Sequence, residues 1–171
     1  NRFSQIFFAS GGMGASPVAD GHSCTAFPTN SGSGSIEAFE SLAPLLVWKK
    51  EFRTDSGGAG QFMGGLGQEV EIEITAEDDV RLSMMSDRQK YAAKGLLGGL
   101  EGAKVEIDKS DGTKPHPKAR SVLAPGDKLT LRFGGGGGYG PPDARDPDAV
   151  QNDLRNGYIT AEYAKRHYGI E

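Results

Sequence analysis

Two polar side chains near the N-terminus have the types and the spacing for acid–base chemistry or metal binding. Asp20 and His22 lie two positions apart in the stretch VADGHS. A carboxylate and an imidazole at this spacing can bind a divalent metal such as Mn or Zn, or transfer a proton. The structural alternative is that Asp20 begins an Asx-turn before Gly21 and that His22 is simply exposed. Asp20 and His22 are the candidate catalytic and metal-binding residues.

A second candidate site lies in the stretch RTDSGGAG. Arg53 can bind a phosphate or a carboxylate through two parallel hydrogen bonds, and the glycines after Ser56 leave backbone N–H groups free to bind an anion. Arg53, Asp55 and Ser56 are therefore candidate substrate-binding residues. The alternative is a capped turn in which Asp55 accepts hydrogen bonds from the amides that follow it, with Arg53 paired to Asp55.

Asp87 and Arg88 are a third polar pair, directly after the alternating stretch LSMMS. We count both as candidate substrate-binding residues because they offer opposite charges at the end of a predicted strand. The alternative is an exposed salt bridge at that strand end, which would contribute little to stability or chemistry.

The single cysteine, Cys24, has two interpretations. It can act as a nucleophile with His22 as the neighbouring base, or it is a small buried thiol without a chemical role. One cysteine cannot form an internal disulfide, so the sequence favours a reducing compartment, and we expect a cytoplasmic location.

Five consecutive glycines, Gly134–Gly138, lie between a predicted strand and the two prolines Pro141 and Pro142. A phosphate-binding loop would need a Lys-Ser or Lys-Thr pair and a helix directly after the last glycine, and neither is present. Two other interpretations stay open. The stretch is either a flexible linker or a loop whose glycines let the backbone approach a partner or a neighbouring domain closely.

The elements that must position these residues are mostly short strands. Alternating apolar residues are typical of half-buried strands, and turn signals separate the alternating segments. This pattern favours an antiparallel unit, so we expect a mainly β fold, a sandwich or barrel-like unit with glycine-rich surface loops. Two of these predicted surface loops are the glycine- and serine-rich stretches at residues 11–23 and 29–35. The predicted strands are residues 5–9, 45–53, 69–75, 80–84, 104–109 and 128–133.

Helix signals occur once near the N-terminus and twice at the C-terminus. Residues 35–46 contain a short helical pattern that Pro44 ends. Asp146 and Thr160 are N-caps of two later helices, which stop at Gly157 and Gly169. We therefore predict a β-rich domain at residues 1–140 and a helical appendage at residues 141–171.

Composition excludes two classes of partner. The net charge of -4 and the absence of a Lys/Arg-rich stripe argue against nucleic acid. No apolar run approaches the length of a membrane-spanning helix, so we expect no membrane association. The chain begins without Met and without a signal-peptide pattern, and we expect it to be part of a longer protein.

Several motifs in order along the chain resemble the C-terminal portion of the hydantoinase B family. That family includes the B half of 5-oxoprolinase and related subunits of acetone and acetophenone carboxylases. Phe133 stands before the glycine run where the family usually has Pro, and Pro141 and Pro142 also depart from its pattern. The matching stretches are GGMGASPVADGHSCTAFPTN, RTDSGGAGQFMGGLGQEVEIEI, LSMMSDRQKYAAKGLLGG and the segment from the glycine run to the final Tyr-Gly.

The resemblance implies an ATP-dependent enzyme built from several parts. Family members open cyclic amides or carboxylate ketones. ATP and Mg²⁺ would bind to a nucleotide-binding A-type partner, and a larger B-type subunit or domain would complete the site; the family's metal ligands lie mostly upstream of this portion. Three functions stay open: part of a cyclic-amide hydrolase, part of a ketone carboxylase, or a non-catalytic structural module of such an assembly.

Overall fold

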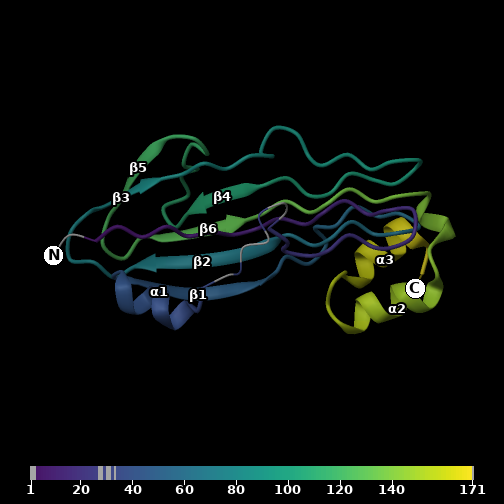
Figure 1. Cartoon of the computed structure of the whole chain (residues 1–171), viewed down its shortest axis with the longest axis horizontal. Helices are drawn as coiled ribbons and strands as arrows, with labels where there is room; N and C mark the ends of the chain where they lie inside the picture. The colour runs from purple at the N-terminus through teal and green to yellow at the C-terminus, as the bar shows by residue number, and fades with distance from the viewer. Residues whose placement is uncertain (1–2, 27–28, 30–31, 33, 171) are drawn as a thin grey trace.

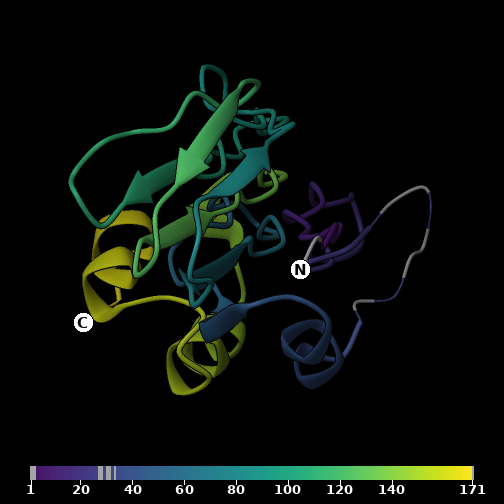
Figure 2. The same ribbon diagram turned by 90° about the vertical axis from the view of Figure 1, so that its left-hand side faces the viewer.

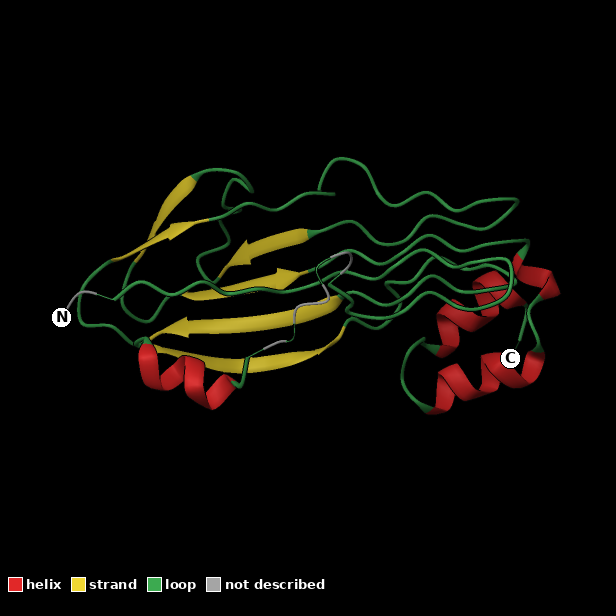
Figure 3. Cartoon of the chain, in the orientation of Figure 1, coloured by secondary structure: helices red, strands yellow, loops and turns green. Residues whose placement is uncertain are grey.

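The computed structural model describes residues 3–26, 29, 32 and 34–170. Strands occupy one half of the molecule, and a group of long irregular segments extends from them towards two C-terminal helices (Figures 1 and 3). The elements in chain order are α1 Ile36–Leu42, β1 Leu45–Phe52, β2 Gln68–Ile74, β3 Val80–Ser83, β4 Glu106–Lys109, β5 Arg120–Leu123, β6 Lys128–Arg132, the 3-10 helix η1 Pro142–Ala144, α2 Pro147–Arg155 and α3 Ala161–Tyr168.

The described strands form two open antiparallel sheets. The larger sheet has the order β1-β2-β6-β4, and β3 pairs with β5 in a two-stranded sheet. This confirms the predicted mainly β, antiparallel class with glycine-rich segments and C-terminal helices. Neither sheet closes into a barrel within the described residues.

The larger sheet has one apolar and one charged face because its residues alternate. In β2, Val70, Ile72 and Ile74 are buried, as their period of two predicts. The other face carries ion pairs such as Lys49 with Glu69 at 3.2 Å and Arg132 with Asp108 at 2.8 Å. The apolar face forms the core with residues of neighbouring segments; its buried members are Val70, Ile72, Val105, Ile107, Leu129 and Leu131.

Beyond the sheets, six glycine-rich segments pack backbone against backbone, with Gly134–Gly138 as the central one. We call them the glycine bundle: residues 11–15, 21–25, 56–60, 63–67, 94–103 and 134–138. They run side by side in Figure 1. Direct bonds join them, for example from Gly58 N–H to the Gly136 carbonyl at 2.8 Å and from Gly138 N–H to the Leu100 carbonyl at 2.9 Å. The backbone polar groups are therefore satisfied between segments.

Space explains the five consecutive glycines of the central segment. None of them has a positive φ, so a left-handed backbone does not require glycine here. A Cβ atom at any of the five would instead collide with a neighbouring backbone. The carbonyl oxygens in the way belong to Ala103, Ser56, Met13, Lys94 and Ala59, at 2.8, 1.8, 1.8, 2.2 and 2.2 Å for Gly134 to Gly138 in order.

This packing decides between the interpretations of the glycine run. The glycines allow close backbone approach, and the approaching segments belong to the same chain. The stretch from Gly11 to Ser23 forms no helix or strand, and its middle, residues 17–20, is exposed as predicted. Its beginning is not at the surface, because Gly12 is buried within the bundle and its N–H bonds the Gly134 carbonyl at 3.0 Å. The other predicted surface loop, at residues 29–35, falls largely outside the described residues.

The helix ends agree with the caps in the sequence. The Ser35 hydroxyl accepts a hydrogen bond from Ala38 N–H at the start of α1. Asp146 and Thr160 accept bonds from Asp148 N–H and Tyr163 N–H at the starts of α2 and α3. Gly169 ends α3 with φ 67°, a conformation that glycine adopts without strain. No helix in the described part of the chain is long and apolar enough to cross a membrane.

Helices α2 and α3 pack on the glycine bundle through an apolar cluster of their own. Met63 and Leu66 of the bundle are buried with Val150, Ile159 and Ala164. The C-terminal helices therefore share a core with the preceding part of the chain. The domain boundary between residues 140 and 141 stays a prediction.

Two strand predictions differ from the structure. Residues 5–9 are extended but form no strand, because no backbone among the described residues pairs with them. Strand β5 was not predicted; its four residues are too short to show alternation, and it is defined by its pairing with β3.

We expect Gly136→Ala to lower the free energy of unfolding by at least about 3 kcal/mol, because the added Cβ would lie against backbone that cannot move aside. Its ideal position is 1.8 Å from the Met13 carbonyl oxygen. Gly34→Ala is the control, since its Cβ meets nothing within 4 Å. Urea unfolding of both variants tests this, and equal stabilities would contradict the packing described here.

Candidate functional site

The most buried charged group in the described structure is Arg145, which directly follows η1 and precedes the N-cap of α2. Its side chain is 2% exposed. Nη1 and Nη2 donate to the two carboxylate oxygens of Asp20, each at 2.8 Å, and Nη2 also donates to Asp153 Oδ2 at 2.8 Å. The Tyr168 ring lies 5.9 Å from the guanidinium carbon. We call Asp20, Arg145 and Asp153 the ion cluster.

The ion cluster joins three segments that are distant in sequence. Asp20 follows the turn between two segments of the glycine bundle, and its Oδ1 also accepts a bond from Met63 N–H at 2.7 Å. Asp153 lies on the buried face of α2. The cluster therefore attaches α2 to the bundle, at the end where the C-terminal helices lie (Figure 1).

Burial and charge act in opposite directions in this cluster. Burial lowers the pKa of Arg145, but hydrogen bonds and the charges of Asp20 and Asp153 outweigh it, so its pKa is raised overall. Burial raises the pKa of Asp153, and Arg145 offsets only part of that shift. With two carboxylates around one guanidinium, the cluster carries excess negative charge when fully ionised.

A cavity of about 370 Å³ borders the ion cluster. The side chain of Asp20 is 45% exposed and Asp146 is exposed as well, so a ligand in this cavity would meet two carboxylates. The cavity is lined by Ala19, Asp20, Gln61, Phe62, Ala144, Arg145, Asp146 and Ala149.

In the described structure, Asp20 and His22 have no further metal-ligating side chains grouped with them. His22 is exposed, and both carboxylate oxygens of Asp20 accept bonds from Arg145. Among the described residues, no group of three or more His, Cys, Asp or Glu side chains could hold a metal ion. Asp20 and His22 as a catalytic or metal-binding pair stay a prediction.

Arg53 and Ser56 lie where the larger sheet meets the glycine bundle. Arg53 Nη2 donates to Glu106 at 2.7 Å, and Nη1 donates to the Lys104 carbonyl at 2.6 Å. Ser56 is fully buried, and its hydroxyl accepts from Gly67 N–H at 2.9 Å and donates to the Arg53 carbonyl. Arg53 therefore pairs with Glu106, not with Asp55.

Asp55 binds the C-terminal helices. Its carboxylate accepts from Thr160 N–H at 2.7 Å and from the Thr160 hydroxyl at 2.8 Å, and its own N–H donates to the Tyr158 carbonyl at 3.1 Å. Asp55 has a φ of 60°, which Asp tolerates better than most residues. It caps α3 together with Thr160 instead of capping its own turn.

Asp87 and Arg88 are both exposed and point to different partners. Asp87 pairs with Lys118 at 2.5 Å, while Arg88 Nη1 donates to the Gly12 carbonyl at 3.4 Å. The structure thus brings Asp20, Arg53, Asp55 and Ser56 into internal contacts and leaves Asp87 at the surface. Their roles in substrate binding stay predictions.

Sequence reasoning missed Arg145. Its partner Asp20 is 125 positions away, so no local spacing joins the two. The only local signal was a charged residue directly before the N-cap of a predicted helix, where a side chain can turn back towards the preceding segments.

Cys24 is a poor nucleophile in this structure. Burial raises the pKa of its thiol to about 11, with Lys50 opposing the shift. The thiol contacts the Leu66 carbonyl at 3.7 Å within the glycine bundle. This favours the interpretation of Cys24 as a packed, unreactive thiol.

The fold and the site together define a β-rich protein organised around a glycine bundle, with an ion cluster at the end that carries the C-terminal helices. The chain belongs to the Hydantoinase B/oxoprolinase family, whose model matches residues 1–142. This confirms the family to which the sequence motifs pointed.

Relatives and solved structures agree with this family. The caprolactamase subunit beta of Pseudomonas jessenii is 32% identical over 81% of this chain and 25% of its own length. A 5-oxoprolinase of Pestalotiopsis fici is 34% identical over 86% of this chain and 12% of its own length. The chain thus spans a quarter or less of these relatives.

Solved structures match nearly the whole chain. The crystal structure of the ATP-dependent caprolactamase of Pseudomonas jessenii has a TM-score of 0.77 at 27% identity, over 94% of this chain and 29% of that chain. A nucleotide-free acetone carboxylase has a TM-score of 0.78 at 24% identity, which shows a shared fold.

We expect Arg145→Ala to lower the free energy of unfolding by about 3–5 kcal/mol, because it leaves the buried Asp153 carboxylate without its cation. Arg155→Ala, at an exposed position of the same helix, should change it by less than about 0.5 kcal/mol. Urea unfolding at neutral pH compares the two, and a loss below about 1 kcal/mol for Arg145→Ala would show that the cluster does not hold α2.

We expect Cys24 to react slowly with iodoacetamide. A thiol with a pKa of about 11 is ionised at pH 8 on the order of a hundredfold less than an ordinary cysteine. The rate should rise with pH up to about 11. Mass spectrometry of the folded and the urea-unfolded chain measures both rates, and equal rates would restore the nucleophile interpretation.

Proposed function

We propose that this chain is the C-terminal portion, or a small subunit, of an ATP-dependent cyclic-amide hydrolase in the cytoplasm. It acts with a nucleotide-binding A-type partner and a larger B-type subunit or domain. The observation that carries the proposal is the identity of 32–34% to relatives named caprolactamase, 5-oxoprolinase and putative D-/L-hydantoinase.

The arrangement of polar residues supports a contribution to a shared site. Most candidate residues are engaged within the chain: Asp20 by Arg145, Asp55 by Thr160, and Arg53 by Glu106. A chain whose charged groups are mostly paired internally offers little chemistry alone. It can instead hold a rigid surface against a partner that supplies the remaining groups.

The proposed chemistry requires a protected site. An amide is a poor electrophile, and phosphorylation of its oxygen at the expense of ATP would turn that oxygen into a leaving group. The B-type part must then position a water, exclude bulk solvent and stabilise the developing negative charge. The cavity beside Asp20, together with the exposed His22, is where this chain can contribute to such a site.

The proposal assigns the cofactors to different parts of the assembly. ATP and Mg²⁺ belong to the A-type partner. Asp20 and His22 are too few to hold Mn or Zn alone, since protein sites for these metals use three or more ligands. A metal site that includes them would take its further ligands from the larger B-type subunit or domain, where the resemblance puts most of the family's metal ligands.

The second candidate is a subunit of a ketone carboxylase. The acetone carboxylase alpha subunit of Xanthobacter autotrophicus is 25% identical over 95% of this chain, and a nucleotide-free acetone carboxylase shares the fold. The higher identity to the amide hydrolases ranks the hydrolase first. A purely structural module is the third candidate.

We expect the complete assembly to hydrolyse ATP in the presence of a cyclic amide and to release the opened amino acid, while this chain alone does neither. The test incubates hydantoin or 5-oxoproline with ATP and Mg²⁺ and measures phosphate and the opened product. Activity with acetone and bicarbonate but with neither cyclic amide would contradict the hydrolase proposal and support the ketone carboxylase instead.

We further expect His22→Asn to lower kcat of the assembly by at least about 100-fold, the usual contribution of a proton-transfer group. His22 is exposed, so the thermal midpoint should not change. His116→Asn, at another exposed histidine, is the control. An unchanged kcat with the His22 variant would leave this chain as a structural module.

A further inference from the structure

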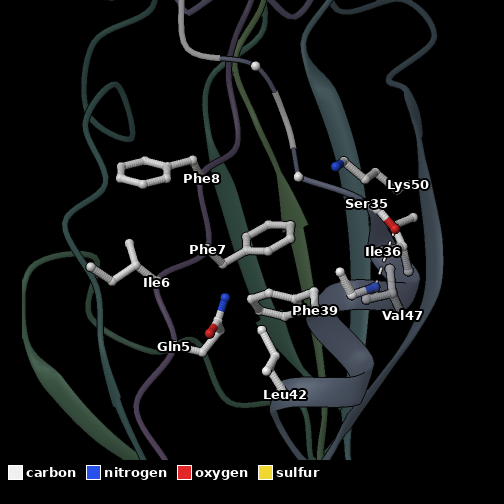
Figure 4. Close-up of a pocket in the computed structure, with 13 residues that line it drawn as sticks. Gln5, Ile6, Phe7, Phe8, Ser35, Ile36, Phe39, Leu42, Val47 and Lys50 are labelled. Atoms are coloured by element: carbon white, nitrogen blue, oxygen red, sulfur yellow. Dashed lines mark hydrogen bonds between the residues drawn. The ribbon is translucent and has the colours of Figure 1, made fainter.

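The segment from Gln5 to Ala9 has the exposure pattern of a strand, but no strand of the described residues pairs with it. Ile6 and Phe8 are 71% and 73% exposed, whereas Phe7 points inwards and contacts the hydrophobic core. The Phe7 ring lies 5.2 Å from the Phe39 ring, and Lys50 Nζ lies 5.7 Å from its centroid. Figure 4 shows Ile6 and Phe8 on the opposite side of the backbone from Phe7.

The backbone of this segment is unpaired within the described part of the chain. From Ser4 to Ser10, no backbone N–H or carbonyl bonds to another described residue; the first backbone bond is at Gly11, whose carbonyl accepts from Thr25 N–H at 3.2 Å. An extended segment with one buried side and free backbone groups presents the pairing edge that strands recognise.

Among the described residues, apolar side chains around this segment are exposed. A groove of about 150 Å³ lies between it and α1, and Leu42 on the rim is 66% exposed. Figure 2, which turns the molecule by 90°, shows the N-terminal segment beside α1, on the side away from the C-terminal helices. Exposed Ile, Phe and Leu side chains gathered around one groove mark an interaction surface.

We propose that a β-strand from the part of a hydantoinase B-type polypeptide that this chain does not cover pairs with residues 5–9. The inference rests on family membership and not on the proposed reaction. The chain matches 94% of its own length to the caprolactamase structure but only 29% of that chain, so such a protein has ample polypeptide to supply the strand.

The chemistry of the added strand follows from the surface that it must cover. Its backbone pairs with the free N–H and carbonyl groups of residues 5–9. Its side chains alternate, with apolar residues against Ile6 and Phe8, because cross-strand pairs of aromatic and branched side chains are favourable. Such pairing would turn residues 5–9 into the strand that the sequence predicts, because the added strand would supply the hydrogen bonds that the described residues do not make to it.

Hydrogen–deuterium exchange tests the pairing. The probe is the intact hydantoinase B-type assembly that contains this sequence, compared with the 171-residue chain alone. In the assembly, alternate amides of residues 5–9 should exchange at least about 100-fold more slowly. This readout needs no turnover, so it is independent of whether the assembly hydrolyses amides.

Substitution of the outward side chains tests the surface. The double change Ile6→Ser and Phe8→Ser should weaken association of the chain with the remaining polypeptide at least about tenfold, with no change in the thermal midpoint of the chain alone. Leu97→Ser, 74% exposed and near the other end of the glycine bundle, is the matched control.

Two results would overturn the proposal. Equal exchange of residues 5–9 in the chain alone and in the assembly would show that nothing pairs with them. Protection in the chain alone that grows with its concentration would show that a second copy occupies the edge instead.

Discussion

The close approach of backbones around Gly134–Gly138 is the constraint on which the rest of the structure depends. A Cβ at any of the five glycines would lie within 3 Å of a carbonyl oxygen, and these oxygens belong to three neighbouring segments, residues 11–15, 56–60 and 94–103. Backbone hydrogen bonds replace side-chain packing as the contact between these segments. One chain can thus build a rigid rod from residues whose composition is otherwise typical of flexible loops.

Contacts with the glycine bundle and its neighbours fix the positions of the polar residues that the sequence singled out. Arg53 and Ser56 bind backbone groups where the sheet passes into the bundle, and Asp55 reaches Thr160 at the start of α3. At the other end, Arg145 joins Asp20 to α2. Apart from Arg145 and Thr160, we predicted these residues as substrate-binding or catalytic from their types alone. In the structure they connect the sheet, the glycine bundle and the C-terminal helices.

This arrangement agrees with the proposal that the chain functions within a larger protein or assembly. The chain spans 25% of the caprolactamase subunit beta and 12% of the 5-oxoprolinase that it resembles. The chain shows an unpaired extended segment at one end and a polar cavity at the other. The bundle lies between them as a stiff connection, so a partner bound at either end would meet a fixed geometry.

Local patterns in the sequence were enough for five of the six strands and for the helix starts, because these depend on neighbours within a few residues. They failed for residues 5–9 and for β5, where pairing with a distant strand decides. The alternation of Val70, Ile72 and Ile74 and the caps Asp146 and Thr160 are such patterns. The role of Gly134–Gly138 could not be predicted from the neighbouring sequence. Glycine is required there because distant segments of the chain pack against it in the folded structure, where a Cβ would collide with them. Tertiary structure likewise decided the pairing of Arg145 with Asp20, because two charges 125 residues apart are joined only by the path of the backbone.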